Sequence, residues 1–395
     1  MGNKRIIIVA ASASEPGQMG GNTKITIEMA RNLPKLDWTV EVIVPAEKKP
    51  TFTDNIGEVE GVTYHTYPRF PGSEFKKALS SPVYHYKMFK AAFEELGASK
   101  GDIVYLNCNF HYEIVPLVLL KRKFGFIYLP SHYLFSPFIL ENLARHYRLP
   151  ALKWLIVWFY ERFFFRMSRL AADGFVITND SDRVNFPGKF QDRLIAIYGG
   201  VNVEQIPDAA AGKIRDVVFC SRLHPQKGVE GLLDIWALAV KELPQARLSI
   251  IGNGAPGYEK RLRDRADRLG ISGNIEWLGY VNNEAKYRIY RETKVFVHST
   301  VFDNNGMVAA EALCSGLPVV MYDLPALRKV YTAGCVKVPY SDKAAFAKAI
   351  VDLLKSPRRL AEVSPDGKTV ESLRSYWRWT NRAELMSAYL EHLYG

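Results

Sequence analysis

Short apolar runs alternate along the whole chain with longer segments in which apolar residues recur every three or four positions. The short runs are typical of buried strands, and the longer segments are typical of amphipathic helices. The predicted strands of the first half are RIIIVA, TVEVIVP, DIVYLNC, FGFIYLP and GFVIT, and those of the second half are DVVFCSR, RLSIIGN, IEWLGY, VFVHST and PVVMYD. Strands that alternate with helices predict parallel sheets built from βαβ units.

The alternation is interrupted between residues 198 and 216, where YGGVNVEQIPDAAAGKIRD is rich in Gly, Ala and polar residues. At 395 residues the chain exceeds what one hydrophobic core usually organises, so we expect two domains. Their boundary is placed near residue 204, with domains over 1–204 and 205–375. The last segment, 376–395, has a helical pattern and either closes the second domain or packs on the first.

The predicted fold class is α/β, with two parallel sheets that face each other across a cleft. Ligands of open parallel sheets bind outside the carboxyl ends of the strands. Clefts between domains are also a favoured place for small-molecule sites. The loops that follow the predicted strands are therefore where we expect the chemistry.

Composition excludes several classes of protein. With 48% hydrophobic residues the chain is globular. Its four cysteines lie far apart and form neither a CxxC pair nor a Cys/His cluster with metal-ligand spacing: Cys108, Cys220, Cys314 and Cys335. They indicate reduced thiols in a cytoplasmic protein, with no disulfide framework and no metal site.

Two apolar runs bear on membrane insertion. The first, from Ile6 to Ala11, is too short for the core of a secretory signal and fits a buried strand better. The second, WLIVWFY at 154–160, is followed at once by Glu161 and Arg162. It falls well short of the ~20 apolar residues that a membrane span needs. We therefore expect a soluble or peripheral protein without a signal peptide.

The net charge of +11 is concentrated in one part of the chain. Between residues 121 and 169, two acidic residues (Glu141 and Glu161) stand against nine basic ones: Lys121, Arg122, Lys123, Arg145, Arg148, Lys153, Arg162, Arg166 and Arg169. Nucleic acid is not the partner we expect, because no recognition module accompanies this charge.

The segment ALKWLIVWFYERFFFRMSRLAADG within this basic region predicts an amphipathic helix. Its two faces differ in character: Arg162, Arg166 and Arg169 lie on one side, and Ile156, Tyr160, Phe163, Phe164 and Met167 on the other. Either the helix packs on the first sheet and exposes a basic stripe, or one face rests on an anionic membrane.

The loop after the first strand, EPGQMGGNTK, contains Gly20 and Gly21 immediately before a helical pattern. A glycine-rich turn of this kind lets backbone N–H groups approach an anion at the positive end of a helix. The loop matches neither GxGxxG nor the Walker pattern. A plain turn is the alternative interpretation.

Two later loops carry groups suited to phosphate. In SRLHPQKGVEGLLDIW, Arg222 and Lys227 flank a turn that leads into a helix, and two such cations can hold a diphosphate. Solvated loop cations are the alternative. The strand exit SIIGNGAPG adds a further glycine-rich loop through Gly252 and Gly254.

The stretch VFVHSTVFDNNGMVAAEALCSG predicts a strand, a polar loop and a helix. The loop would present the Asp303 carboxylate and backbone N–H groups, and Glu311 lies about one and a half turns into the helix. A ligand with hydroxyls and a diphosphate needs both kinds of group. The alternative is that Asp303 is an ordinary N-cap and Glu311 a surface carboxylate.

The order SRLHPQKG, IIGNG, WLGYV, FVHSTVFDNNGMVAAEALCSGLPVV resembles the nucleotide-binding half of the retaining glycosyltransferases of family four (glycosyl transferases group 1). The resemblance covers about 215–325 and continues in the first half through GQMGGN, LPSHY and YGGVN, and at Trp379. It implies the GT-B fold of two Rossmann-like domains. The first domain would bind the acceptor and the second the nucleotide sugar, and the last helix would cross back to the first.

The resemblance also implies roles for individual residues. Arg222 and Lys227 would bind the donor phosphates, Glu311 the ribose, and His132 of LPSHY would line the reaction centre. Asp303 stands where the family has a glutamate that contacts hydroxyls of the transferred sugar. Further donor contacts would come mainly from the backbone of loop residues: Gly20, Gly21, Gly252, Asn304, Asn305, Gly306 and Met307.

The sequence departs from the family pattern at three places. Asp303 is one methylene shorter than the usual glutamate, Asn304 and Asn305 replace a Gly-Phe pair, and Ser299 replaces a proline. These departures affect the identity of the donor sugar. His132 has the alternative of a satisfied core histidine. His111 and Glu113, in NCNFHYE, either contact the acceptor or pack within their loop.

The activity that the resemblance implies is transfer of a sugar from a UDP- or GDP-sugar to an acceptor hydroxyl, with retention and without a metal or other cofactor. A cytoplasmic protein with a membrane face favours a lipid-linked or cell-envelope glycan as the acceptor. The alternatives are a nucleotide-sugar epimerase or hydrolase of the same fold, and a non-catalytic subunit that binds a sugar nucleotide or a lipid.

Overall fold

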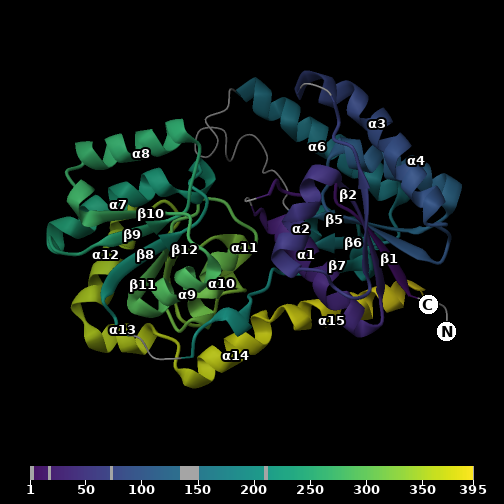
Figure 1. The fold of residues 1–395 in the computed structure, drawn as a ribbon. Coiled ribbons are helices and arrows are strands. Elements are labelled where there is room, and N and C mark those ends of the chain that lie inside the picture. Colours follow the sequence, from purple (N-terminus) through teal and green to yellow (C-terminus); the bar gives the residue numbers. More distant parts are fainter. Residues whose placement is uncertain (1–3, 17–18, 72–73, 134–150, 209–211, 395) are drawn as a thin grey trace. The chain divides into compact units, whose positions relative to one another are not determined.

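The computed structural model describes residues 4–16, 19–71, 74–133, 151–208 and 212–394. Within these residues the chain divides into two compact units (Figure 1). Residues up to 133, from 151 to 199 and from 379 onward form the first, and residues 200–378 form the second. Some residues used in the sequence analysis lie outside the described ranges: Gly17, Gln18, Glu141, Arg145 and Arg148.

The first unit is built on a parallel sheet with the strand order β3-β2-β1-β4-β5-β6-β7. In the centre, β1 pairs with β2 and β4, so Ile6–Val9 are fully buried on both faces. Burial on both faces explains why the strands read as continuous apolar runs. The strands are β1 (Arg5–Val9), β2 (Thr39–Pro45), β3 (Val62–Tyr67), β4 (Asp102–Leu106), β5 (Ile127–His132), β6 (Phe175–Ile177) and β7 (Leu194–Ala196).

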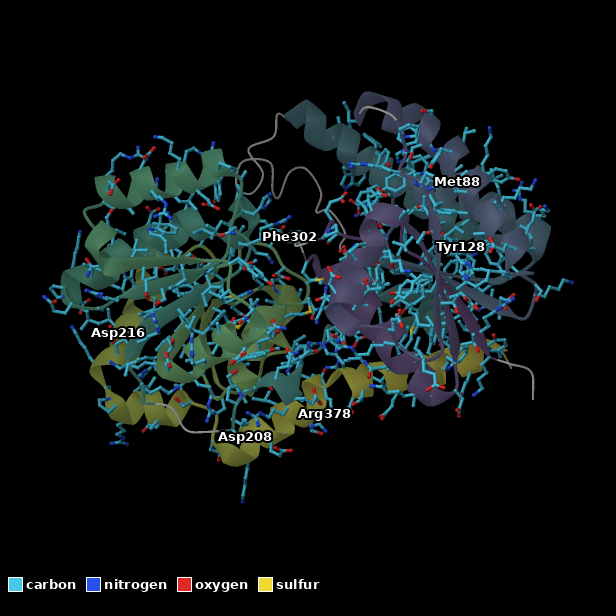
Figure 2. The ribbon with its side chains drawn as sticks, viewed as in Figure 1. Met88, Tyr128, Asp208, Asp216, Phe302 and Arg378 are labelled. Atoms are coloured by element: carbon cyan, nitrogen blue, oxygen red, sulfur yellow. The ribbon has the colours of Figure 1, made fainter. Side chains whose placement is uncertain are left out.

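Helices cover both faces of this sheet (Figure 1). One layer contains α3 (Glu74–Glu95), α4 (His111–Phe124) and α6 (Ala151–Ala171), with α4 packed against the other two. The other contains α1 (Gly21–Asn32), α2 (Lys49–Ile56) and α15 (Trp379–Tyr394), with α1 packed against both. Tyr128 of β5 belongs to the core beneath the first layer, and Met88 of α3 packs against that core (Figure 2).

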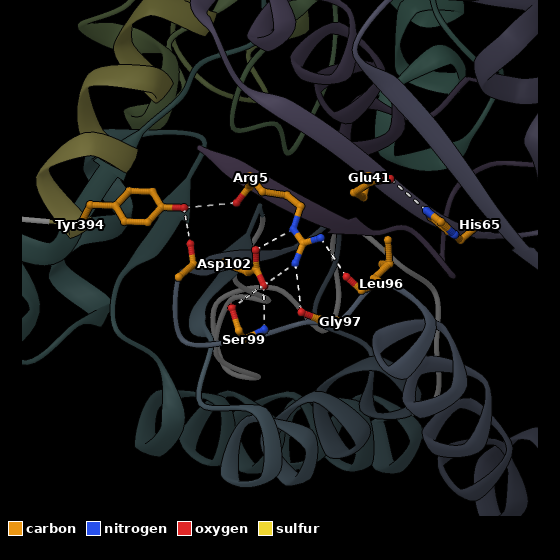
Figure 3. A network of polar contacts seen from close by, with 9 residues as sticks. Arg5, Glu41, His65, Leu96, Gly97, Ser99, Asp102 and Tyr394 are labelled. Atoms are coloured by element: carbon orange, nitrogen blue, oxygen red, sulfur yellow. Dashed lines mark hydrogen bonds and ion pairs between the residues drawn. The ribbon is translucent and has the colours of Figure 1, made fainter. Parts of the chain in front are cut away.

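The last helix, α15, is bound to the first unit by specific contacts. Trp38 Nε1 donates to Ser387 Oγ at 2.9 Å, and the Trp38 and Tyr394 rings lie 5.7 Å apart. Beside them, Arg5 donates through Nε and Nη2 to Asp102 at 2.7 and 2.8 Å (Figure 3). The Tyr394 hydroxyl lies 2.6 Å from the carbonyl oxygen of Gly101, so the network joins β1, the start of β4 and α15.

The second unit has its own parallel sheet, in the order β10-β9-β8-β11-β12-β13. The strands are β8 (Arg215–Cys220), β9 (Leu248–Ile251), β10 (Ile275–Gly279), β11 (Thr293–His298), β12 (Val319–Tyr322) and β13 (Cys335–Val338). The helices are α7 (Val229–Glu242), α8 (Pro256–Arg268), α9 (Asn283–Glu292), α10 (Met307–Cys314), α11 (Pro325–Arg328), α12 (Lys343–Lys355), α13 (Pro357–Val363) and α14 (Gly367–Trp377).

The α/β fold class is confirmed, because each unit has a parallel sheet whose strands alternate with helices. The division of the chain falls a few residues from the sequence boundaries at 204 and 376. All four cysteines are free thiols. Among the described residues, no helix combines the length and apolar character needed to cross a membrane.

Candidate active site

The candidate site lies at the carboxyl edge of the second sheet, where β8 and β11 are neighbours. Adjacent parallel strands end at the same edge, so the loops after them lie side by side. Three hydrogen bonds to backbone carbonyl oxygens join the two loops. Gln226 Nε2 donates to the carbonyl oxygen of Phe302 at 2.8 Å, Val301 N to that of Gln226 at 3.1 Å, and Ser299 Oγ to that of Lys227 at 3.2 Å. Phe302 marks this edge in Figure 2.

Lys227 and Asp303 form an ion pair across these loops. Lys227 Nζ donates to Asp303 Oδ2 at 2.6 Å, and their side chains are 21% and 14% exposed. Both charges are thus mostly removed from water while one edge of the pair remains accessible. Such a pair can exchange partners with an incoming anion more readily than a fully buried pair.

The other carboxylate oxygen of Asp303 organises the start of α10. Oδ1 accepts the backbone N–H groups of Asn305 and Gly306, each at 3.1 Å. Burial alone would raise the pKa of Asp303, but the Lys227 charge and these hydrogen bonds hold it well below its usual range. Asp303 is therefore an anion of fixed orientation, as the N-cap interpretation and the functional one both require.

His298, at the end of β11, lies behind this carboxylate. Its Nε2 is 3.8 Å from Asp303 Oδ2 and 3.2 Å from Thr300 Oγ1. Burial lowers the pKa of His298 to about 4, although the Asp303 charge acts in the opposite direction. A neutral imidazole at this position adds no second positive charge beside Lys227.

Gly306 begins α10 in the left-handed region, at φ 61°. Tyr331 Oη lies 2.7 Å and 2.8 Å from the carbonyl oxygens of Asn305 and Gly306 and holds this turn from the buried side. Asn304 and Asn305 are buried, and Met307 is half-buried. The backbone of this turn is therefore fixed before any ligand arrives.

Two further glycines are required by close approach of the backbone. A Cβ at Gly228 would lie 2.0 Å from the carbonyl oxygen of Ser299, and one at Gly252 would lie 1.9 Å from that of Ser221. Both residues have positive φ, at 69° and 130°. These contacts let the loops after β8, β9 and β11 pack at one edge of the sheet.

Arg222 is exposed on the same edge, and no hydrogen bond or ion pair to it is found within the described parts of the chain. Neighbouring His224 is partly buried, and burial together with the charges of Arg222 and Lys227 lowers its pKa. Arg222 therefore offers a planar donor fork to an anion without first breaking an internal ion pair.

Glu311 lies in α10 and is paired with a residue that the sequence analysis did not single out. Lys286 of α9 donates to Glu311 Oε2 at 2.8 Å, and the two side chains are 12% and 16% exposed. Lys286 Nζ also lies over the Tyr287 ring, 4.6 Å from its centroid. One carboxylate oxygen is thus held, and the other remains available to accept from a hydroxyl.

In the first unit, Gly20 and Gly21 lie where helix α1 begins, as the sequence predicted. Gly20 precedes the first residue of α1, and its N–H donates to Ser14 Oγ at 2.9 Å. A Cβ at Gly20 would lie 2.9 Å from Asn22 Oδ1. Gly21 is exposed at the N-terminal end of this twelve-residue helix. The turn therefore presents the positive end of a helix to solvent.

His132 ends β5 and is 2% exposed. Its Nδ1 lies 3.0 Å from Asn109 Nδ2, and its Nε2 lies 3.7 Å from the carboxylate of Glu161. Burial lowers the pKa of His132, whereas Glu161 raises it. The side chain has the polar contacts that a core histidine needs, and it also lies at the carboxyl edge of the sheet.

His111 and Glu113 lie at the start of α4 and have different surroundings. His111 Nδ1 is hydrogen-bonded to the Tyr160 hydroxyl of α6. Glu113 is fully buried, its Oε1 accepts from Ser12 N at 2.9 Å, and burial raises its pKa to about 8. Both side chains thus have polar partners within the first unit, and an acceptor role for either stays a prediction.

Within the second unit, the structure brings Arg222, Lys227 and Asp303 to one edge of the sheet, and Glu311 follows on α10. Within the first unit, Gly20, Gly21 and His132 lie at the carboxyl ends of β1 and β5. Sequence reasoning assigned no role to Lys286, Tyr331 or His298. The position of His298 at the end of a predicted strand was a signal for its location. Lys286 and Tyr331 had no such signal, because their partners are about 25 residues away in the sequence.

A parallel sheet with cations, a fixed carboxylate and tight glycine turns at its carboxyl edge has the groups that phosphate-binding sites of this architecture use. Residues 204–370 match the family model for glycosyl transferases group 1. The second unit therefore belongs to the glycosyl transferases group 1 family, which is consistent with the family-four resemblance.

Curated relatives include the phosphatidyl-myo-inositol mannosyltransferase of Mycobacterium leprae, 34% identical over 41% of this chain and 44% of that protein. Another is the mannosylfructose-phosphate synthase of Agrobacterium fabrum, 28% identical over 46% of this chain and 40% of that protein. The matched segments thus span only about two fifths of the length of these relatives.

The whole chain shares its GT-B fold with solved structures. The sucrose-phosphate synthase of Thermosynechococcus elongatus has a TM-score of 0.80, with 17% identity and 99% of both chains covered. Anabaena HepE in complex with UDP and glucose has a TM-score of 0.72, with 17% identity over 98% of this chain and 99% of that one. At these identities the likeness establishes the fold alone.

Proposed function

We propose that the protein is a retaining glycosyltransferase that moves a sugar from a UDP- or GDP-sugar to an acceptor hydroxyl. The observation that carries this proposal is the Lys227–Asp303 ion pair beside the exposed Arg222, within the segment that matches the family model. A nucleotide sugar offers a diphosphate to the cations and hydroxyls to the carboxylate. The site thus has a complementary group for each half of the donor.

In the proposed reaction, the bond between the anomeric carbon and the diphosphate oxygen breaks, and a bond from the same carbon to the acceptor oxygen forms on the same face. The acceptor proton passes to the departing phosphate. Negative charge grows on the diphosphate as the bond breaks, so Arg222 and Lys227 would stabilise the transition state more than the ground state. Asp303 would accept from sugar hydroxyls, and Glu311 from the ribose.

The proposal does not require a metal, because Arg222 and Lys227 would supply the positive charge at the diphosphate. No group of three or more metal-binding side chains gathers within the described parts of the chain. Metal independence stays a prediction and is tested by comparing turnover in Mg²⁺ with turnover in a chelator. A fall of tenfold or more in the chelator would contradict it.

We also propose a lipid-linked or cell-envelope glycan as the acceptor, reached from the cytoplasmic face of the cell membrane. The support is the Mycobacterium leprae relative, which is a phosphatidyl-myo-inositol mannosyltransferase. A second support is the row of exposed apolar side chains on α6.

The donor proposal is tested by thermal unfolding with UDP, GDP and their sugar conjugates, with and without Mg²⁺. One nucleotide should raise the unfolding temperature of the wild type and fail to do so in Glu311→Ala. The matched control is Glu284→Ala, which removes an exposed carboxylate from α9 and should keep the shift. No shift with any nucleotide would contradict the proposal, and binding without product would favour a non-catalytic subunit.

A further inference from the structure

Helix α6 exposes a row of large apolar side chains, which we call the α6 face. Ile156 is 60% exposed, Phe159 59%, Phe163 63% and Leu170 82%. Their spacing of three, four and seven residues places all of them on one side of the helix. Scattered apolar residues are normal on a protein surface, but a contiguous row of this kind marks an interaction site.

The structure corrects the sequence-based description of this helix. Ile156 and Phe163 were expected opposite an exposed basic stripe, but they form the exposed face themselves. Phe164 and Met167 pack against the core instead. Phe165 fills the core beneath β6. The helix has more large apolar residues than one buried face can take, and the excess remains in contact with solvent.

The arginines lie along the flank of the α6 face. Arg166 is exposed, whereas Arg162 and Arg169 are half-buried and lie over the rings of Trp158 and Phe165, at 5.4 and 5.8 Å from the centroids. Long basic side chains that cover apolar surface in this way keep their charged ends near water. The flank is therefore basic as well as amphipathic.

Glu161 is the one carboxylate in the described part of the helix. Glu161 is 13% exposed and lies 3.7 Å from His132 Nε2, on the side of the helix that faces the sheet. The neighbouring α4 adds exposed Leu119 and Arg122. The surface therefore combines an apolar row with a local excess of positive charge. Helices α4 and α6 belong to the same layer of the first unit (Figure 1).

We propose that the α6 face docks on the surface of an anionic lipid bilayer. The apolar row would lie at the boundary between headgroups and acyl chains, and the arginines would meet lipid phosphates. Charge complementarity favours this occupant over a second copy of the chain, because a symmetric contact through α6 would bring the two arginine flanks together. The inference rests on this surface and does not depend on the transfer activity.

The test is co-sedimentation with vesicles of phosphatidylcholine alone or with 30% phosphatidylglycerol, at about 0.1 and 0.5 M salt, where screening differs strongly. Wild type should partition onto anionic vesicles and lose binding at high salt. Phe159→Ser with Phe163→Ser should reduce the partition coefficient about tenfold, and so should Arg122→Gln with Arg166→Gln. All variants are first checked for an unchanged unfolding temperature.

Matched controls remove similar groups elsewhere. Val184→Ser with Leu385→Ser removes apolar residues of the same unit that are 87% and 49% exposed. Lys260→Gln with Lys348→Gln removes two basic side chains that are 78% and 73% exposed. Both control pairs should bind vesicles as wild type does.

A second measurement reports directly whether α6 contacts the lipid bilayer. An environment-sensitive dye on Phe163→Cys should shift to the blue with anionic vesicles, whereas the same dye on Val184→Cys should not. The proposal is overturned if wild type stays in solution with anionic vesicles, or if the phenylalanine pair binds them as well as wild type does. Self-association lost in the phenylalanine pair, without vesicle binding, would assign the face to a second copy.

Discussion

Single residues at the candidate site are organised by charge pairing. Lys227 neutralises Asp303, and Lys286 neutralises Glu311, so both carboxylates are held in one orientation by a lysine. Arg222 has no such partner within the described residues. An incoming diphosphate would therefore meet Arg222 first and then share Lys227 with Asp303. This order keeps the ion pair partly satisfied throughout binding.

Removing either proposed phosphate-binding cation should slow the reaction. We expect Lys227→Ala and Arg222→Ala each to lower turnover by about 10²-fold, the scale of losing one preorganised transition-state contact. Turnover is measured as release of nucleoside diphosphate from the donor that the binding panel identifies. Lys260→Ala, which removes an exposed lysine from α8, is the control and should retain full turnover. Turnover near that of the wild type in both variants would refute the assignment.

Glu113 should make stability depend on pH. Burial raises its folded pKa from 4.5 to about 8, so the folded state keeps a proton that the unfolded state releases between these values. The contribution of this bound proton to the free energy of unfolding is complete below pH 4.5 and is lost as the pH rises towards 8. We expect Glu113→Gln to gain stability relative to wild type over this window.

The measurement for Glu113 is the free energy of unfolding in urea at pH 5, 6.5 and 8. Exposed Glu284→Gln is the control and should follow wild type at all three pH values. If Glu113→Gln keeps a constant difference from wild type across the window, then the buried carboxyl does not carry the proton that we assign to it.

The sequence identified the candidate site residues that directly follow strands. It could not identify those that contact the site from a neighbouring helix. Arg222 and Asp303 were predictable because β8 and β11 both end at the same edge. Lys286 meets Glu311 across 25 residues of sequence, from a helix whose polar residues form no motif. Pairings of this kind depend on how helices pack, which the periodicity of one helix does not determine.

Central strands were predicted well from sequence, whereas one of the four edge strands in the described sheets, β10, was predicted. All ten predicted strands are present with ends shifted by a few residues. The central ones read as apolar runs because they are buried on both faces. Among the described residues, the strands that were missed are β3, β7 and β13, and each lies at the edge of its sheet. β3 reads VTYHTY and is half exposed, as edge strands commonly are.

The same reasoning explains the partial error on α6. Helical periodicity located the helix and its amphipathic character, and α6 spans Ala151–Ala171. The pattern could not decide which of two apolar arcs would be buried. Packing against the core selected Phe164, Phe165 and Met167 and left Phe159 and Phe163 outside.

The joint between β1, β4 and α15 should be important for stability. Asp102 is 6% exposed and receives two hydrogen bonds from Arg5, so Arg5→Met would leave a nearly buried carboxylate without its cation (Figure 3). We expect a loss of about 2 kcal/mol in the free energy of unfolding. Urea unfolding measures it.

The neighbouring residue provides a control for this joint. Lys4 also forms an ion pair, with Glu391 of α15, but the two side chains are 41% and 50% exposed. Lys4→Met should therefore change stability by no more than about 0.5 kcal/mol. Equal losses of unfolding free energy in Lys4→Met and Arg5→Met would mean that the burial of Asp102 does not determine how much its ion pair with Arg5 stabilises the protein.

At the scale of the whole molecule, the fold is retained where the sequence is not. A TM-score of 0.80 accompanies only 17% identity across 99% of the chain, whereas the family model matches only residues 204–370. Core positions accept many apolar combinations, but the proposed donor-binding edge needs particular cations, carboxylates and glycines. The second unit is therefore recognisable from motifs, and the first unit mainly from its alternation of strands and helices.

The two proposed surfaces lie in different units, so their functions should separate in variants of the full chain. Phe159→Ser with Phe163→Ser should lose most of its vesicle binding and keep the nucleotide-induced rise in unfolding temperature, because both residues lie in α6 of the first unit. Lys227→Ala should lose most of that rise and keep vesicle binding, because Lys227 lies in the second unit.

Both quantities are measured on each variant, by co-sedimentation with anionic vesicles and by thermal unfolding with the selected nucleotide. Loss of both in Lys227→Ala would mean that the substitution damages the fold or that vesicle binding needs the nucleotide site. Retention of the thermal shift in Lys227→Ala would show that this lysine does not contribute to nucleotide binding. The proposal for the α6 face would not be affected by that result. Because each proposal fails through a different measurement, an error in one does not conceal an error in the other.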